Sequence, residues 1–207
     1  MTPLLSDLNP QQLEAITLPH QSVLVLAGAG SGKTRVLTTR IAYLIQSGQV
    51  SPHGILAVTF TNKAAKEMLA RITAMLPINP RGMWIGTFHG LCHRMLRTHY
   101  QDAGLPQAFQ ILDSADQLAL IKRILKELSV DDKKFPPRQV QWFINNAKES
   151  GLRAAYVTTD DVFSRHMLEF YQAYEQQCHK EGVVDFAELL LRSYELLSRN
   201  EILCRHY

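Results

Sequence analysis

A glycine-rich loop at residues 27–34, with the sequence AGAGSGKT, constrains the fold of this chain more than any other feature. It follows directly on a short apolar run at residues 22–27 (SVLVLA), whose β-branched content predicts a buried strand. From Lys33 onward, apolar residues recur at helical spacing until Gly48, which predicts a helix that stops there. A strand, a glycine loop and a helix in immediate succession indicate an α/β fold.

The residue types in this loop are suited to binding a polyphosphate. Gly28, Gly30 and Gly32 let the backbone turn sharply, so that its N–H groups and the start of the next helix face phosphate oxygens. Lys33 adds a full positive charge, and the hydroxyl of Thr34 is placed to bind the Mg²⁺ that bridges the outer phosphates. We therefore expect a site for ATP and Mg²⁺.

The usual pattern is G-x-x-x-x-G-K-[ST], and here its first position is Ala27. The flanking strand and helix still favour a nucleotide site over an ordinary glycine loop. Loops of this kind serve kinases, GTPases, transporters and motors, so the loop gives a class and other residues must decide the function.

The strand-and-helix rhythm continues in the first half of the chain and then stops. Ile55–Phe60 and Met83–Thr87 predict two further buried strands, each leading into a helix, which indicates a parallel sheet flanked by helices. After about residue 98 long helical stripes follow, with no further pair of buried strands, which indicates a helical insertion.

Capping patterns predict where three of the later helices begin. Ser114 with Gln117, Thr158 with Asp161, and Asp185 with Glu188 each have the spacing of a helix start.

Composition places the chain among folded proteins without deciding a function. It is 46% hydrophobic and 20% charged, and no apolar stretch approaches the roughly 20 residues of a membrane span. The first ten residues lack a secretory signal, so we expect a cytoplasmic protein with no membrane partner. A net charge of +3 is compatible with a nucleic-acid partner but does not require one.

Gln12 lies about fifteen residues ahead of the loop, in the segment LNPQQ. Its amide can donate and accept at once, as recognition of the N6 and N7 edge of adenine requires. The competing interpretation is a solvated glutamine at the polar start of a helix.

Four ordered segments, LNPQQLEAI (8–16), AGAGSGKTR (27–35), AVTFTNKAAKEM (57–68) and GTFHGLCHRMLR (86–97), resemble the UvrD/Rep/PcrA helicases of superfamily one. The likeness extends through residues 109–128 and 183–190, and so covers essentially the whole chain. It implies a RecA-like P-loop NTPase domain, 1A, at residues 1–98 and 183–207, interrupted by an all-helical subdomain, 1B, at residues 99–182. It also implies 3′-to-5′ movement on single-stranded DNA, including junctions of single- and double-stranded DNA.

The resemblance assigns roles residue by residue. Gln12 becomes the adenine contact, Lys33 the phosphate clamp, Thr34 the Mg²⁺ ligand and Arg35 a further nucleotide contact. The nucleotide-binding set is Gln12, Gly28, Ala29, Gly30, Ser31, Gly32, Lys33, Thr34 and Arg35, with Lys33 and Thr34 as its catalytic members. The DNA-binding set is Thr59, Phe60, Asn62, Lys63, Thr87, Phe88 and His89, whose polar groups can hold phosphates while the aromatic rings stack on bases.

Plainer interpretations exist for members of the DNA-binding set. Phe60 taken alone reads as a core aromatic that closes a strand, and Lys63 as part of a solvated helix face. His89, Cys92 and His93 have helix-compatible spacing for a metal, but a fourth ligand is absent and the DNA-binding pattern accounts for His89.

Hydrolysis also needs an acidic strand end and arginine fingers. Asp113 and Asp185 read better as helix caps, and Asp160-Asp161 has no apolar strand before it. In the resembled family the acidic segment follows shortly after the point where this chain stops, at Tyr207, so we expect a truncated piece of a longer helicase that is inactive alone and monomeric. Repair or replication proteins are expected partners, without an indication of which pathway.

Two other functions stay open. One is a nucleotide-switched module that binds DNA or protein, and the other, with less support, is a P-loop kinase, which would need an arginine-rich lid that the later half does not offer.

Overall fold

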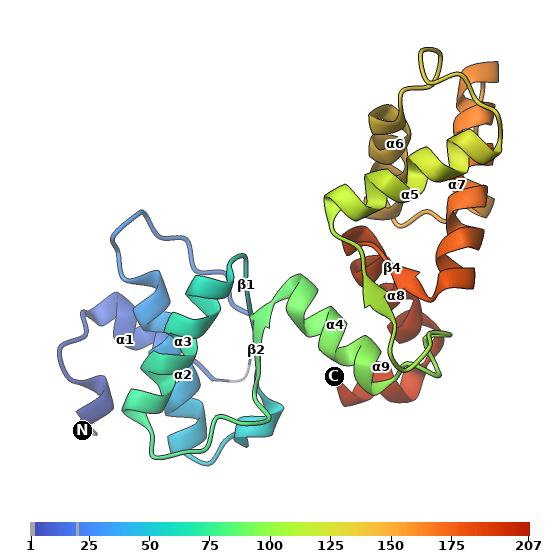
Figure 1. Ribbon diagram of the computed structural model, residues 1–207. Helices are drawn as coiled ribbons and strands as arrows, with labels where there is room; N and C mark the ends of the chain where they lie inside the picture. The colour runs from blue at the N-terminus through green and yellow to red at the C-terminus, as the bar shows by residue number, and fades with distance from the viewer. Residues whose placement is uncertain (1–2, 20) are drawn as a thin grey trace. The chain divides into compact units, whose positions relative to one another are not determined.

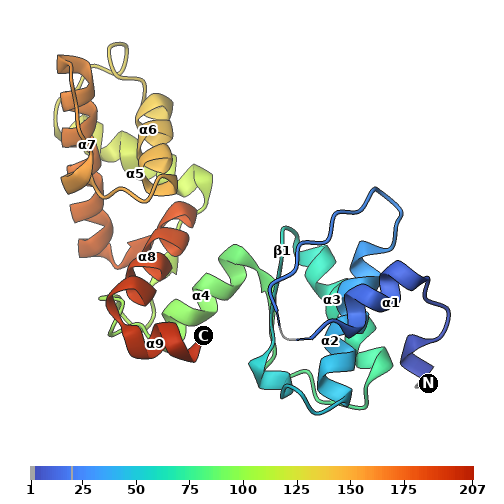
Figure 2. The same cartoon turned by 180° about the vertical axis from the view of Figure 1, so that it is seen from behind.

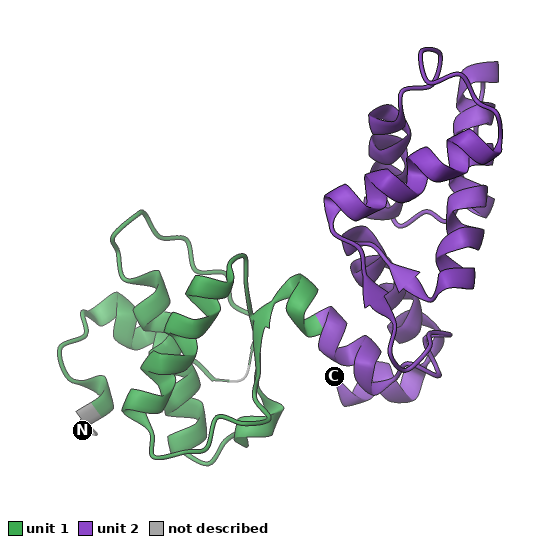
Figure 3. Ribbon diagram, viewed as in Figure 1, with its two compact units in different colours: residues 1–91 green, residues 92–207 purple. Residues whose placement is uncertain are grey.

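The computed structural model describes residues 3–19 and 21–207. The chain divides into two compact units, residues 1–91 and 92–207, and the boundary falls inside helix α4 (Phe88–Thr98) (Figure 3). The assignment of residues 99–182 to an inserted subdomain, and of 183–207 to a motor domain, stays a prediction.

The first unit is a helix-rich α/β arrangement. It contains the short turn η1 (Pro3–Leu5), helix α1 (Pro10–Thr17), helix α2 (Lys33–Gln46), the turn η2 (Pro52–Gly54), strand β1 (Leu56–Thr59), helix α3 (Asn62–Met75) and strand β2 (Trp84–Thr87) (Figure 1). Strands β1 and β2 pair in parallel, from Leu56 opposite Trp84 to Thr59 opposite Thr87. The two later predicted strands are therefore confirmed.

The core of this unit lies among α2, α3 and the two strands. Its buried side chains include Ile41, Ile55, Ala57, Met68 and Ile72. Seen from behind in Figure 2, the labelled helices α1, α2 and α3 gather together in this unit.

The strand predicted at residues 22–27 does not form, and that expectation is wrong for this structure. The segment has no regular secondary structure and no ladder partners among the described residues, and the side chains of Leu24 and Leu26 are 82% and 84% exposed. A strand is defined by hydrogen bonds to a neighbour, and β1 makes its described pairing with β2 alone. An apolar sequence is thus not enough to make a strand where no neighbour pairs with it.

The second unit is built mainly of helices. Helices α5 (Ser114–Glu127), α6 (Pro137–Glu149) and α7 (Val162–Glu181) pack around one core, with the short turn η3 (Ala154–Tyr156) between the last two. Helix α8 (Phe186–Arg199) and helix α9 (Glu201–His206) follow, and Leu96, Phe109, Val184, Leu189 and Leu196 form a second core there.

The expectation that no strands occur after residue 98 is wrong in one detail. Strands β3 (Gln110–Ile111) and β4 (Val183–Val184) form a two-residue parallel pair. Phe109 and Val184, beside and within this pair, are both buried. The pair is too short for its apolar residues to have been recognised as a strand by periodicity.

Candidate nucleotide and DNA site

Helix α1 places Gln12 beside the glycine loop. Asn9 caps the helix, since its side chain accepts from the backbone N–H of Gln12 at 2.8 Å, and Gln12 Oε1 accepts from the Asn9 N–H at 3.2 Å. The other end of the same amide, Nε2, donates to the carbonyl of Ser31 at 3.1 Å. The structure therefore brings the predicted adenine contact against the predicted phosphate loop.

The loop has the backbone that its glycines were expected to allow. Gly30 and Gly32 have φ values of 75° and 85°, in the left-handed region that other residues rarely adopt. A Cβ on Gly32 would lie 3.1 Å from Nε2 of Gln12, so this position has a second reason to be glycine. Ser31 steadies the turn by donating from Oγ to the carbonyl of Gly28 at 2.8 Å.

Lys33 lies over the loop. Its Nζ donates to the carbonyl oxygens of Ala27 and Gly28 at 2.9 and 2.5 Å. The ammonium is thus held by the backbone at the base of the loop, beside the point where α2 begins.

The start of helix α2 presents backbone donors. Gly32 is its N-cap, and within residues 3–19 and 21–207 no side chain hydrogen-bonds to this helix start. The first N–H groups of a helix have no partner inside the helix, so such an end is suited to an anion. Thr34 and Arg35, in this first turn, are exposed, and Arg35 also lines a pocket of about 470 Å³ with Thr38 and Arg71.

The predicted DNA-binding residues meet at the carboxyl ends of the two paired strands. Thr59 lies opposite Thr87 in the β1–β2 register, and the next residues, Phe60 and Phe88, have ring centroids 6.0 Å apart. Phe60 is 89% exposed and Phe88 49%, which contradicts the alternative in which Phe60 is a core aromatic.

The remaining members of that set lie at adjoining helix starts. Thr61 caps α3, accepting from the Ala64 N–H at 3.2 Å, and this places Asn62 and Lys63, both exposed, in the first turn. Thr87 Oγ1 accepts from the Gly90 N–H at 3.1 Å, and His89 follows Phe88 in α4.

Asp113 and Asp185 are helix caps, as predicted, and Asp161 is a helix cap that was not predicted. Asp113 accepts from the N–H groups of Ala115 and Asp116, and Asp161 from that of Ser164. Asp185 accepts from the N–H of Glu188 at 2.7 Å. The predicted caps Ser114 and Thr158 are wrong, because Asp113 and Asp161 occupy the N-cap positions.

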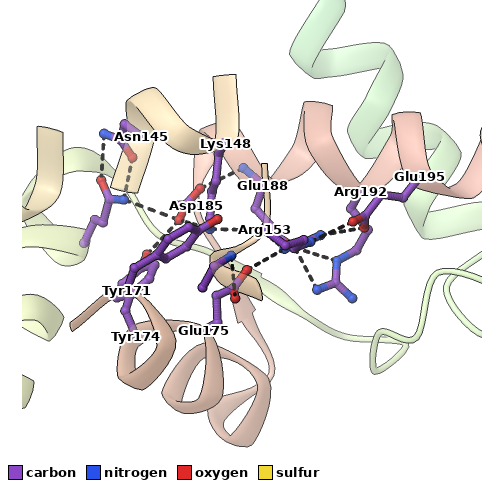
Figure 4. A network of polar contacts seen from close by, with 12 residues as sticks. Asn145, Lys148, Arg153, Tyr171, Tyr174, Glu175, Asp185, Glu188, Arg192 and Glu195 are labelled. Carbon is purple, nitrogen blue, oxygen red and sulfur yellow. Dashed lines mark hydrogen bonds and ion pairs between the residues drawn. The ribbon is translucent and has the colours of Figure 1, made fainter. Parts of the chain in front are cut away.

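Asp185 is also the centre of a buried network that the sequence did not predict (Figure 4). Its Oδ2 accepts from Lys148 Nζ at 2.6 Å and from the Tyr174 hydroxyl at 2.8 Å. Lys148 also lies 2.9 Å from Glu188, and Arg153 donates to Glu188 at 2.8 Å. Such residues scatter through the sequence at unrelated spacings, so no local pattern indicates them.

Mutual charge sets the protonation of this network. Burial would lower the pKa of Lys148, but the neighbouring Glu188 and Asp185 carboxylates outweigh it and leave that pKa raised. Burial would likewise raise the pKa of Glu188, and Lys148 and Arg153 outweigh it and leave that pKa lowered. The network is therefore a set of ion pairs in a hydrophobic unit.

Among the described residues, no group of three or more His, Cys, Asp or Glu side chains could hold a metal ion. None of the helices in the described part of the chain is long and apolar enough to cross a membrane.

The first unit is a helix-rich α/β unit in which a glycine loop leads into helix α2 and two short strands pair in parallel, and this is the arrangement expected of a P-loop nucleotide-binding protein. The UvrD/REP helicase N-terminal domain matches residues 8–207, and the chain belongs to this family.

Relatives agree with this assignment. The chain is 52% identical over 205 residues to DNA helicase II of Escherichia coli (strain K12), covering 99% of the chain and 28% of that protein. It is 52% identical over 209 residues to DNA helicase II of Haemophilus influenzae, covering 99% of the chain and 29% of that protein. It is 44% identical over 202 residues to ATP-dependent DNA helicase PcrA of Bacillus subtilis, covering 95% of the chain and 27% of that protein. The chain thus spans less than a third of the length of these relatives.

Proposed function

We propose that this chain is the nucleotide- and DNA-binding part of an ATP-dependent DNA helicase that moves 3′ to 5′ on single-stranded DNA. The observation that carries the proposal is the glycine loop, which leads into the uncapped start of α2 with Lys33 beside it. The family and the names of the relatives, one of which is an ATP-dependent DNA helicase, support the same function.

The loop residues fit a triphosphate with Mg²⁺ in chemistry. Three features of the site offer donors to anionic oxygens. They are the loop backbone at its two left-handed glycines, the free N–H groups of the first turn of α2, and the Lys33 ammonium. The ammonium would exchange two carbonyl partners for phosphate oxygens, which are stronger acceptors. Thr34 would supply a hydroxyl to Mg²⁺, and Gln12 would read the base, with Arg35 as a further contact. Bound ATP supplies the phosphoanhydride bond whose hydrolysis drives movement.

The ends of β1 and β2 fit single-stranded DNA. Two exposed aromatic rings whose centroids lie 6.0 Å apart offer faces for bases, and Thr59, Asn62, Lys63, Thr87 and His89 lie beside them in sequence as partners for phosphates. We propose that single-stranded DNA binds along this surface.

The RecA-like sheet is part of the proposal. Residues 23–26 have the apolar composition of a strand and exposed side chains, but no neighbour pairs with them among the described residues. We propose that the additional chain present in relatives more than three times as long supplies such a neighbour and completes the sheet. We infer that hydrolysis and unwinding depend on that further length, so that the 207 residues bind without unwinding. Participation in DNA repair or replication is proposed on the family alone.

Lys33→Ala tests nucleotide binding. Titration of the chain with a fluorescent ATP analogue and Mg²⁺ should show at least a tenfold weaker Kd for this variant, the loss of a charge-assisted contact of about 1.5–3 kcal/mol. Lys66→Ala is the matched control, because Lys66 is an exposed lysine on α3. Equal affinities for Lys33→Ala and Lys66→Ala would refute the phosphate site.

Phe60→Ala with Phe88→Ala tests DNA binding. Base stacking on an aromatic ring contributes about 1–3 kcal/mol per base, so the double variant should bind single-stranded oligonucleotides at least tenfold more weakly. Tyr194→Ala removes a comparably exposed ring from α8 and should leave binding unchanged. A P-loop kinase would show no binding that increases with oligonucleotide length.

A further inference from the structure

Hydrogen bonds join both ends of helix α1 to other parts of the first unit, and a different residue makes them at each end. At its first turn, Gln12 donates to Ser31 in the glycine loop. At its last turn, the guanidinium of Arg40, from helix α2, donates through Nη1 to the carbonyl oxygens of Ala15, Ile16 and Leu18 at 3.2, 3.0 and 3.0 Å. Its Nη2 reaches the Pro19 carbonyl at 3.5 Å.

The Arg40 contacts satisfy groups that a helix leaves open. The last carbonyls of a helix have no partner inside it and carry the negative end of the helix dipole. A cation that donates to several of them is the matching partner for such an end. Leu18 closes the helix with one backbone bond to Glu14, so Arg40 is the side chain that caps this end in the described structure.

This attachment matters because α1 is too short to be stable by itself. It has eight residues, fewer than the roughly 12–15 that an isolated helix needs for marginal stability in water. Of its residues, only Ile16 is buried, at the end that Arg40 contacts. The location of Gln12, one turn into this helix, therefore depends on what fastens the opposite end.

Arg40 is also aligned along helix α2 with Lys33, the lysine at the end of the glycine loop. It follows Lys33 by seven residues on α2, which is two helical turns, so both side chains project from one face of that helix. The two residues, with Val36 and Leu37, line a single pocket of about 420 Å³ that also touches Ala15. Helix α2 thus carries Lys33, the proposed phosphate contact, at its first residue, and Arg40, which contacts the end of α1, two turns later.

We propose that Arg40 is a positioning residue that holds Gln12 at the nucleotide base and thereby sets the preference for adenine over guanine. The proposal rests on the nucleotide site described above. Arg40 donates its hydrogen bonds to the carbonyls of residues 15–19, so its effect on the base would be transmitted through the placement of α1.

The test compares base preference with phosphate binding in the purified chain. Fluorescent ATP and GTP analogues give the ratio of the two Kd values, and inorganic tripolyphosphate, as a competitor, reports the loop alone. Arg40→Ala should lower the ratio of the GTP Kd to the ATP Kd by about two- to tenfold, which corresponds to the free energy of one well-placed hydrogen bond. The affinity of this variant for tripolyphosphate should be unchanged. Arg40→Lys should keep much of the preference, because its ammonium can donate to the same carbonyls.

Arg71→Ala is the matched control, since Arg71 is an exposed arginine of α3 that pairs with Glu67 on the same helix. Hydrogen exchange supplies a measurement that needs no nucleotide: residues 10–17 should exchange faster in Arg40→Ala, while the α3 peptides should not.

The outcomes separate the two proposals. An unchanged ATP-to-GTP ratio in Arg40→Ala overturns the role of Arg40, as does an equal loss of tripolyphosphate affinity, which would mean general damage to the unit. Wild-type chain that binds neither nucleotide nor tripolyphosphate overturns the proposed function, and the role of Arg40 with it. Wild-type chain that binds both nucleotides equally overturns only base reading by Gln12 and its positioning by Arg40.

Discussion

Lys148 donates through Nζ to Oδ2 of Asp185 across 2.6 Å, and each side chain is only 2% exposed. The bond joins the end of helix α6 to the N-cap of α8. Because Asp185 also receives the Tyr174 hydroxyl, one carboxylate fastens three helices of the second unit.

We expect Lys148→Ala to be among the most destabilising substitutions in the second unit. It would leave Asp185 and Glu188 buried without their shared cation, and breaking a buried pair in this way costs about 3–5 kcal/mol. The measurement is the free energy of unfolding in urea, followed by circular dichroism. Lys122→Ala, at an exposed position of α5, should change it by less than about 0.5 kcal/mol. Similar losses in both variants would contradict the role given to the network.

Acid should weaken the same network. The pKa of Glu188 lies below its ordinary value of 4.5 in the folded chain, because Lys148 and Arg153 outweigh the effect of burial. The pKa of Glu195 is also lowered, mainly by its hydrogen bond from Arg153. A lowered folded-state pKa gives stability that is complete above the unfolded value and is lost as the pH falls from there toward the folded value. The free energy of unfolding should therefore begin to fall below about pH 4.5.

Glu188→Gln isolates this contribution. The variant should be less stable than the wild type at neutral pH, but its stability should fall less between about pH 5 and about pH 3, since one linked proton is removed. Glu149→Gln, at an exposed position of α6, should keep the wild-type pH dependence. A Glu188→Gln curve parallel to that of the wild type would show that this carboxylate does not carry the acid response.

Sequence reasoning succeeded where the information is local. The helix after the glycine loop, the strands at Leu56–Thr59 and Trp84–Thr87, and the loop's left-handed glycines all follow from spacing and residue type within a few positions. The sequence did not predict that Phe60 approaches Phe88, although parallel strands bring their carboxyl ends to one edge of a sheet.

It failed where a partner distant in sequence decides the outcome. Residues 22–27 have a strand's composition but no described neighbour to pair with. Lys148, Arg153 and Arg40 were not noticed because nothing near them in the sequence marks their partners, which lie 37, 35 and 22–25 residues away. From the sequence alone, charged residues on a helix are interpreted as a solvated face, because their packing partners are not yet known.

The start of helix α7 allows a direct comparison between a sequence pattern and the structure. Asp161 accepts from the Ser164 N–H at 2.9 Å, whereas Thr158, the cap that the sequence predicted, lies outside the helix and is exposed. Asp161→Ala should cost about 0.5–2 kcal/mol and Thr158→Ala close to nothing, measured by urea unfolding. The reverse order would restore the sequence-based cap and move the start of the helix.

Gly182 ends helix α7 in the left-handed region, at φ 66°, and a Cβ there would meet Cγ of Pro106 at 2.8 Å. Gly151 has φ 80° but nothing within 4 Å of its Cβ position, so it provides a matched control. Gly151→Ala should cost about 1–2 kcal/mol, the backbone penalty alone. Gly182→Ala should cost about 1–3 kcal/mol more, because the proline ring lies in the way and packing must shift. Thermal unfolding of the two variants measures the difference directly. Equal costs would mean that the loop carrying Pro106 moves aside freely, and that the contact between residues 104–106 and the end of α7 does not hold the second unit together.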